Sequence, residues 1–377
     1  MRLPAWLRKA TWRGTWILLL TLFTVMPVAF AGKTRQVVIV TSDGIRWREV
    51  FQGADPTLMN AKDGGIWVPA AQLESKYGGV DSDTRRRRLF PFLWGVVSTQ
   101  GQLFGNQDLG SRVRTSNRVN VSYAGYNEML SGVADPRIGS NEFGLNPNVT
   151  VLEWLAQQRQ FQGRVDVFAA WSTFHEILAE PRSGLPVRAG ATLVDPADAS
   201  PRGQLLSELY RSTTRLYGDD PYDSFVYVAL REHLRRARPR VLYVAFGDTD
   251  LWQHLGRYDA FLESAHAFDG FLADLWKQLQ SMPEYRNQTT LIVSTDHGRG
   301  NGLQEWKEHG PAQRGSEDIW LGVLGPDTAA LGERRHVQDV TQAQIAATVA
   351  EMLGQDFRKF KPGAAPPLAE AHGSARH

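Results

Sequence analysis

The sequence predicts an α/β fold, a three-layer α/β/α sandwich around a mostly parallel central sheet. Continuous apolar runs rich in Val, Ile and Leu recur along the chain, as is typical of strands buried on both faces of a parallel sheet. Amphipathic segments alternate with these runs, and such alternation indicates helices packed against the sheet. Several of the runs also end in polar residues, which a strand that only fills a core does not need.

Six apolar segments are the predicted strands. They lie at residues 36–40, 102–104, 164–169, 241–246, 291–293 and 319–324. Three segments have helical patterns, at residues 151–156, 258–282 and 342–353. The longest of these carries Phe261, Phe268 and Leu272 on one stripe, and Gly354 after the third is a helix stop signal.

The N-terminal segment has the order of a secretory signal peptide. Basic residues precede an apolar run at 16–23, and the small-x-small triplet Ala29-Phe30-Ala31 follows. We therefore predict a signal peptide at residues 1–31 and a periplasmic or secreted protein. The apolar run is short for a membrane span, so no stable membrane anchor is expected.

The remaining chain is predicted to form one domain and a tail. Residues 32–355 contain all the predicted strands and helices, whereas residues 356–377 are rich in Pro, Ala and Gly and are expected to be disordered. The formal net charge is +2, so no strong positive field indicates a nucleic-acid partner. The chain has no cysteine, which excludes disulfides, thiolate nucleophiles and Cys-ligated zinc. Oligomeric state has no signal in the sequence.

Three predicted strands lead into carboxylates, namely Asp43, Asp250 and Asp296. In open α/β sheets, ligands bind beyond the carboxyl ends of the strands. If these strands are parallel neighbours, the three acids converge on one edge of the sheet. Like charges gathered there repel one another unless cations neutralise them, which indicates bound metal.

Three of the nine histidines accompany these acids. His254 follows Asp250 by four residues and shares its face if the segment is helical. His297 is adjacent to Asp296, and His309 lies in a loop next to a glycine. Mixed carboxylate and imidazole ligands suit zinc, with manganese as the alternative.

The order of these residues resembles the alkaline phosphatase superfamily. The resemblance runs from Asp43-Gly44 through a hydroxyl-bearing segment, Asp250 and His254 to Asp296-His297-Gly298 and His309, over about residues 36–354. This superfamily includes alkaline phosphatases, nucleotide pyrophosphatase/phosphodiesterases, sulfatases and cofactor-independent phosphoglycerate mutases. The resemblance implies an alkaline phosphatase-like fold and two divalent metal ions.

The resemblance also implies the two ligand sets. One ion would be held by Asp250, His254 and His309. The other would be held by Asp43, Asp296, His297 and the oxygen of the nucleophile. Two such ions would activate the attacking oxygen and stabilise the oxygens of the ester.

The nucleophile is predicted to be Ser122. In members of the superfamily it lies ten residues before a glycine that ends a helical pattern, and Gly132 is that glycine here. The serine would attack phosphorus and form a phosphoseryl intermediate that water hydrolyses. In the alternative, Ser122 is a helix cap and Ser116 or Thr115 attacks.

Two further residues are predicted to contact substrate. Asn127 could donate to a phosphate oxygen, and Arg299 follows the Asp-His pair. For Arg299, a solvated loop position is the alternative.

The implied function is exported, two-metal hydrolysis of a small-molecule phosphoric ester by a phosphatase or phosphodiesterase. This assigns residues 32–355 as the catalytic domain. The sulfatase pattern C/S-x-P-x-R is absent, because Tyr123 and Ala124 follow Ser122. Hydrolysis of a sulfuric ester or phosphonate on the same fold stays open, as does a non-catalytic binding protein that keeps the fold.

Overall fold

The computed structural model describes residues 32–195, 198 and 200–371. The predicted signal peptide at 1–31 lies outside the described residues. Six predicted strands and three predicted helices fall inside them. Among these residues, we find no helix with both the length and the apolar character needed to cross a bilayer.

The centre of the fold is an eight-stranded sheet in the order β10-β2-β9-β7-β1-β6-β4-β5. Within the described chain, β9 is antiparallel to both of its neighbours, and every other neighbouring pair is parallel. The fold class predicted from the sequence is therefore confirmed. The strands are β1 (Gln36–Ser42), β2 (Gln102–Phe104), β4 (Val165–Ala169), β5 (Val187–Ala189), β6 (Val241–Phe246), β7 (Thr289–Ser294), β9 (Leu321–Leu324) and β10 (Gly332–Glu333).

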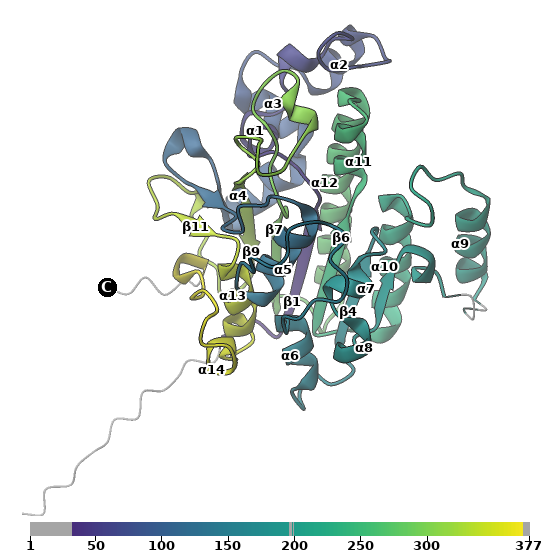
Figure 1. Ribbon diagram of the computed structural model, residues 1–377, viewed down its shortest axis with the longest axis vertical. Helices are drawn as coiled ribbons and strands as arrows, with labels where there is room; N and C mark the ends of the chain where they lie inside the picture. The colour runs from purple at the N-terminus through teal and green to yellow at the C-terminus, as the bar shows by residue number, and fades with distance from the viewer. Residues whose placement is uncertain (1–31, 196–197, 199, 372–377) are drawn as a thin grey trace, which may run out of the picture. The chain divides into compact units, whose positions relative to one another are not determined.

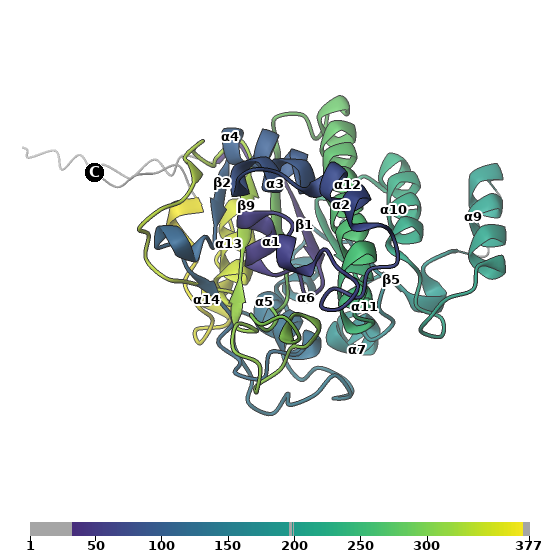
Figure 2. The same ribbon diagram turned by 90° about the horizontal axis from the view of Figure 1, so that it is seen from above.

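Helices cover both faces of this sheet (Figures 1 and 2). Alternate residues of β1 define the two cores, because Val38 faces one and Ile39 the other. The first core contains side chains of α1 (Trp47–Gln52), α2 (Ala70–Tyr77), α3 (Ser82–Leu89), α10 (Asp223–Ala237) and α12 (Tyr258–Ser281). The second contains side chains of α5 (Ser122–Ser131), α6 (Val151–Gln157), α7 (Phe174–Ile177), α13 (Gln344–Met352) and α14 (Phe357–Phe360).

The other elements are short or peripheral. A small second sheet has the order β11-β3-β8. Its strands are β3 (Val113–Arg114), β8 (Asp318–Ile319) and β11 (Val340–Thr341), and the other α-helices are α4 (Ser98–Gln100), α8 (Glu180–Ser183), α9 (Pro201–Ser212) and α11 (Asp248–His254). Six further helical turns are η1 (Pro56–Leu58), η2 (Leu93–Val97), η3 (Gln107–Leu109), η4 (Gly190–Thr192), η5 (Glu305–Lys307) and η6 (Ala369–Ala371).

The predicted strand at 319–324 is divided at Trp320. Ile319 pairs in the small sheet, and Leu321 begins β9 in the large one. The carbonyl of Trp320 accepts a hydrogen bond from Ser294 Oγ at 2.6 Å, and its indole donates to the Ile45 carbonyl at 3.2 Å. One continuous apolar run thus contributes a strand to each of the two sheets, which the sequence did not indicate.

The C-terminal segment differs from the expected disorder. Residues 356–371 have defined positions, and Phe357, Ala364 and Leu368 are buried. The ring of Phe357 packs edge-on against Trp154 of α6, with centroids 5.3 Å apart. The burial of these apolar side chains therefore orders the segment, although its overall composition is typical of disorder. Residues 372–377 lie outside the described residues.

The three strands that lead into acids are neighbours. β1 pairs in parallel with β6 on one side and β7 on the other, with Ser42 opposite Phe246 and Thr41 opposite Ser294. Asp43, the start of α11 and Asp296 therefore leave the sheet at the same edge. This arrangement confirms the convergence that the sequence predicted.

Gly125 lets α5 approach this edge. A Cβ built at Gly125 would lie 2.3 Å from the backbone carbonyl oxygen of Asp296, a distance that real side chains do not reach. The helix begins at Ser122, three residues earlier. Glycine at 125 is therefore required for the N-terminus of α5 to lie against the end of β7.

We predict that Gly125→Ala lowers the free energy of unfolding by about 1–3 kcal/mol, because the new methyl group must displace the backbone at Asp296. Urea unfolding would measure this change. The matched control is Gly270→Ala in α12, where a Cβ meets nothing within 4 Å. That variant should gain roughly 0.5–1 kcal/mol from helix propensity. Equal stability of Gly125→Ala and the wild type would contradict the close approach.

Candidate active site

One group of possible metal ligands lies at the ends of β1 and β7. It consists of Asp43, Asp296 and His297, whose ligand atoms all lie within 4.8 Å of one another. His297 Nε2 is 3.4 Å from Asp43 Oδ1 and 3.4 Å from Asp296 Oδ2. All three side chains are buried.

In each of the two carboxylates of this group, one oxygen accepts a hydrogen bond and the other does not. Gly44 N–H donates to Asp296 Oδ1 at 3.1 Å, and Tyr126 O–H donates to Asp43 Oδ2 at 3.1 Å. Asp43 Oδ1 and Asp296 Oδ2 accept no hydrogen bond from any described residue. Burial and the neighbouring Asp296 raise the pKa of Asp43 well above its usual range. Two buried oxygens without donors, facing one imidazole nitrogen, fit a divalent cation.

His297 is oriented as a ligand. Its Nδ1 donates to the Gly298 carbonyl at 2.9 Å, which leaves the lone pair on Nε2 toward the two carboxylates. Burial lowers the pKa of His297, and this favours the neutral ring that can bind a metal ion.

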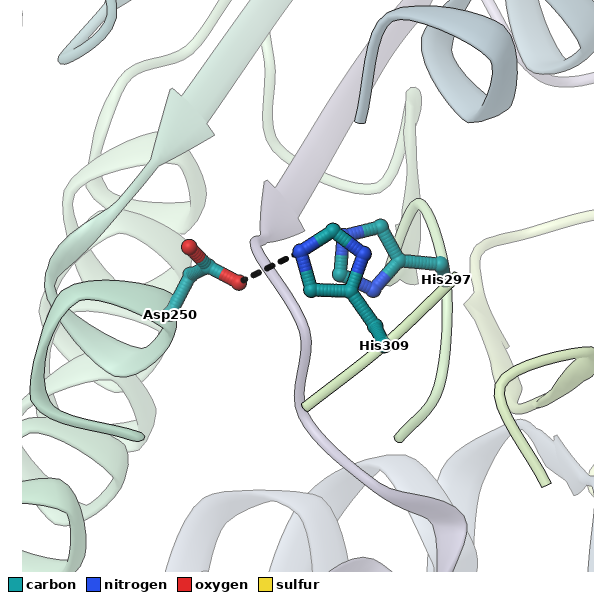
Figure 3. Close-up of side chains that lie close together, drawn as sticks. All are labelled: Asp250, His297 and His309. Atoms are coloured by element: carbon teal, nitrogen blue, oxygen red, sulfur yellow. Dashed lines mark ion pairs between the residues drawn. The ribbon is translucent and has the colours of Figure 1, made fainter. Parts of the chain in front are cut away.

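A second group consists of Asp250, His297 and His309 (Figure 3). His309 Nε2 lies 4.0 Å from Asp250 Oδ1, and the rings of His297 and His309 stack with centroids 3.9 Å apart. His309 Nδ1 donates to the Asn120 carbonyl at 2.8 Å, so its Nε2 also carries a lone pair. Burial lowers the pKa of His309 as well.

His254 adjoins this second group. α11 places it one turn after Asp250, and its Nε2 lies 3.3 Å from Asp250 Oδ2 and 3.1 Å from His309 Nε2. Two ring nitrogens at this distance need a proton or a cation between them. The structure thus brings together all six predicted ligands, and His297 belongs to both groups. Nitrogen and oxygen ligands of this kind suit zinc or manganese.

Ser122 lies beside His297. It is the first residue of α5, and its Oγ is 3.3 Å from His297 Nε2. The helix cap is Val121, and no side chain caps this end, so the structure does not use Ser122 as a cap. The alternative hydroxyls are engaged elsewhere. Thr115 Oγ1 donates to Asn120 Oδ1 at 2.7 Å, and Ser116 Oγ donates to Glu128 Oε1 at 2.6 Å.

Arg299 is buried rather than solvated, with 1% of its surface exposed. Its guanidinium pairs with Asp250 Oδ1 and donates to the Lys307 carbonyl. Burial lowers the pKa of Arg299 to about 9. The solvated-loop alternative is therefore wrong, and this side chain contacts the carboxylate of the candidate ligand Asp250 and the loop before His309.

Asn127 lies away from the cluster, which corrects its prediction as a substrate contact. Its Nδ2 donates to the Val133 carbonyl at 3.2 Å, and its Oδ1 accepts from Asn146 and Asn148. The side chain is fully buried in these contacts. It therefore ties α5 to the loops that follow.

A cavity of about 360 Å³ opens beside the cluster. We call it the active-site cavity. Ser122, Asp43, Asp250 and His254 are among the residues that line it. Asn141 also lines it, and its Oδ1 accepts a hydrogen bond from Tyr123 N–H at 3.0 Å. The sequence analysis missed Asn141, because it lies in a loop without a motif.

Comparisons with known proteins agree with this geometry. The sequence matches the family described as Type I phosphodiesterase / nucleotide pyrophosphatase over residues 110–342, more than half of the chain. This span contains Ser122 and five of the six predicted ligands, with Asp43 before it. No curated protein sequence matches the chain.

Three solved structures share the fold at low identity. The alkaline phosphatase PafA has a TM-score of 0.54 at 11% identity, covering 91% of this chain and 99% of its own. The phosphonate monoester hydrolase SpPMH from Silicibacter pomeroyi has a TM-score of 0.52 at 12% identity, covering 88% and 78%. The lipoteichoic acid synthase LtaP from Listeria monocytogenes has a TM-score of 0.52 at 11% identity, covering 86% and 73%.

The fold and the family match lead to the same assignment. The structural matches give the alkaline phosphatase-like sandwich, and the sequence match gives the branch of that superfamily. This chain belongs to the Type I phosphodiesterase / nucleotide pyrophosphatase family of the alkaline phosphatase superfamily, and it is a hydrolase of phosphoric esters.

Proposed function

We propose that this hydrolase uses Ser122 as its nucleophile and two divalent cations, zinc or manganese, as cofactors. The observation that carries the proposal is the position of Ser122 Oγ, 3.3 Å from His297 Nε2 and next to the donor-free oxygens of Asp43 and Asp296. Phosphodiesters and nucleotide pyrophosphates are the first substrates to test, because the matching family is described by those activities.

The residues divide into three roles. Asp43, Asp296 and His297 would hold one cation, and Asp250, His254 and His309 the other. Ser122 would attack phosphorus, release the alcohol of the ester and carry the phosphoryl group until water removes it. Bound cations would stabilise the negative charge on the attacking and leaving oxygens.

Two features of the chain support the attack by Ser122. The N-terminus of α5 presents backbone N–H groups, which favour the negative charge of a phosphate held there. Gly298 fixes the tautomer of His297, so that the lone pair on Nε2 points toward the serine side of the site. The paired Arg299 would keep Asp250 in place on the opposite side.

We also propose that the protein is exported. The basic, apolar and small-x-small order of residues 1–31 supports this proposal, and a chain without cysteine needs no oxidative folding.

Ser122→Ala should lower kcat by at least about a thousandfold while the protein stays folded, because the attacking oxygen is removed. Hydrolysis of bis(p-nitrophenyl) phosphate with metal-loaded protein would measure this loss. Acid quenching of the wild type during this reaction, followed by peptide mass spectrometry, should find one p-nitrophenyl phosphoryl group on Ser122. The matched control is Ser116→Ala, which should keep most of its activity. Loss of activity in Ser116→Ala alone would overturn the assignment.

Metal binding should be measurable without turnover. Saturating zinc at about one hundred times its Kd should stabilise the apoprotein by roughly 2.7 kcal/mol for each site, seen as a rise in Tm. His254→Ala should lower the bound metal by one ion per chain. The control His336→Asn changes an exposed histidine at a positive φ that Asn tolerates, and should bind both ions. Equal metal content in the two variants would contradict the ligand assignment.

Export is tested by expressing the full chain in a bacterium. The mature protein should be found outside the cytoplasm and begin at Gly32, as determined by N-terminal sequencing. Replacing Leu19 and Leu20 with Arg in the apolar run should keep the protein in the cytoplasm. A full-length wild-type protein in the cytoplasm would refute the prediction.

A further inference from the structure

Glu128 is a fully buried carboxylate that the proposed mechanism does not use. It lies in α5, and its two oxygens accept hydrogen bonds from the loop at residues 115–121, which we call the α5 loop. The backbone N–H of Ser116 lies 2.9 Å from both oxygens, and the Ser116 hydroxyl donates to Oε1 at 2.6 Å. Asn117 donates to Oε2 through its backbone N–H at 2.9 Å and through Nδ2 at 3.0 Å. The carboxylate therefore fixes the α5 loop to the helix that follows it.

The α5 loop has a backbone conformation that needs such contacts. Arg118 and Asn120 have φ angles of 61° and 52°, in the left-handed region that residues other than glycine rarely adopt. Asn117 extends the restraint, because its Oδ1 accepts the backbone N–H groups of Val119 at 3.0 Å and Asn120 at 2.8 Å. Strained backbone of this kind persists only where surrounding contacts hold it. Glu128 supplies such contacts directly at the start of the loop, and through Asn117 at its end.

The end of the α5 loop contacts a candidate metal ligand. The Asn120 carbonyl accepts the hydrogen bond from His309 Nδ1 at 2.8 Å, which leaves the lone pair of His309 on Nε2. The ligands of the other candidate group are oriented by contacts outside this loop, with Gly44, Tyr126 and Gly298. A change in the α5 loop should therefore act on one ligand group more than on the other.

We infer that Glu128 is a positioning residue for the candidate ligand His309. It acts through the α5 loop, by fixing the Asn120 carbonyl that sets the tautomer and the orientation of the His309 ring. This inference rests on the proposed function, because it takes His309 as a ligand of the ion at Asp250 and His254.

An amide at position 128 cannot replace the carboxylate. Glutamine has one acceptor oxygen, so its NH2 group would face either the N–H of Ser116 or the two donors of Asn117. Part of the contact is lost in both orientations, and the strained loop is held less firmly. Ser116→Ala, the control used above for Ser122, removes only the hydroxyl donor and leaves both backbone N–H contacts in place.

Titration of the apoprotein with Co²⁺, followed by calorimetry and by visible absorption, tests the inference. The wild type should bind two ions. In Glu128→Gln, one ion should bind about ten- to a hundredfold more weakly, because a contact that orients a ligand histidine is loosened. The other ion should keep its wild-type affinity. The weakened ion should have the absorption bands that are missing in His254→Ala.

The matched control is Glu153→Gln. Glu153 is also buried in a helix, α6, where its oxygens accept hydrogen bonds from Arg182 at 3.0 and 2.8 Å. This variant should have a lower Tm than the wild type but the same affinity for both ions. The comparison separates positioning of His309 from a general loss of stability.

A measurement without metal shows whether the effect passes through the ring of His309. In apoprotein with isotope-labelled histidine, nitrogen NMR should find the His309 proton on Nδ1 in the wild type and in Glu153→Gln. In Glu128→Gln both tautomers should be populated. If Glu128→Gln does not fold, Asn117→Ala removes the next contact toward Asn120 and should give the same changes.

Three outcomes would overturn the inference. These are wild-type affinity for both ions in Glu128→Gln, equal weakening of both ions, and an unchanged His309 tautomer. Wild-type protein that binds fewer than two ions would instead refute the proposed ligand sets. In that case the tautomer measurement still decides whether Glu128 orients the His309 ring, so the two failures can be told apart.

Discussion

The mutual repulsion of buried carboxylates at one edge of the sheet is the constraint on which the site depends. Asp43 and Asp296 are both buried, and the structure gives each of them one oxygen without a donor. Such a pair is costly in a low-dielectric environment unless positive charge is bound between the oxygens. The acids are close together because β1, β6 and β7 are parallel neighbours, so that their carboxyl ends lie side by side. The chemistry of the site thus follows from sheet topology.

Contacts around the acids fix the orientation of the two histidine rings and place a positive charge next to Asp250. Gly298 and Asn120 accept the Nδ1 protons of His297 and His309, so that both rings turn their Nε2 atoms inward. Arg299 supplies a positive charge next to Asp250, because its guanidinium pairs with Asp250 Oδ1. These groups contact the candidate ligands His297, His309 and Asp250.

The six candidate ligands could be selected from the sequence because their signal is local. An apolar run followed by an acid identifies a strand end, and the spacing of Asp250 and His254 needs only one helical turn. Arg299 and Asn127 could not be placed, because their environments depend on segments 49 and about 20 residues away. β10 has two residues, too few to show a pattern, and β5 has Arg188 between Val187 and Ala189, so neither contains an apolar run that predicts a strand. The prediction of disorder after residue 355 was wrong for residues 356–371. It rested on composition, and composition does not show that a few apolar side chains in the segment pack against the domain.

The lining of the active-site cavity shows the same limit. Trp171, Asp220 and Asp248 come from three segments, and no motif connects them. The hydrogen bond from Ser172 N–H to Asp220 joins two of these segments, and the bonds from Gly247 and Asp248 N–H to Asp223 join the third. Specificity in this fold can therefore change through loops while the ligand set stays constant.

The central pairing of β1 has a consequence for how the enzyme folds. Ser42 meets Thr249 across 207 positions of the chain, and Gly44 meets Asp296 across 252. Closing loops of that length is entropically unfavourable, and folding slows as contacting residues lie farther apart in sequence. All six candidate ligands are together only after both of these long closures. A chain released before β7 is made would therefore contain Asp43, Asp250 and His254 but lack Asp296, His297 and His309, so the complete candidate site forms only when the sheet is assembled.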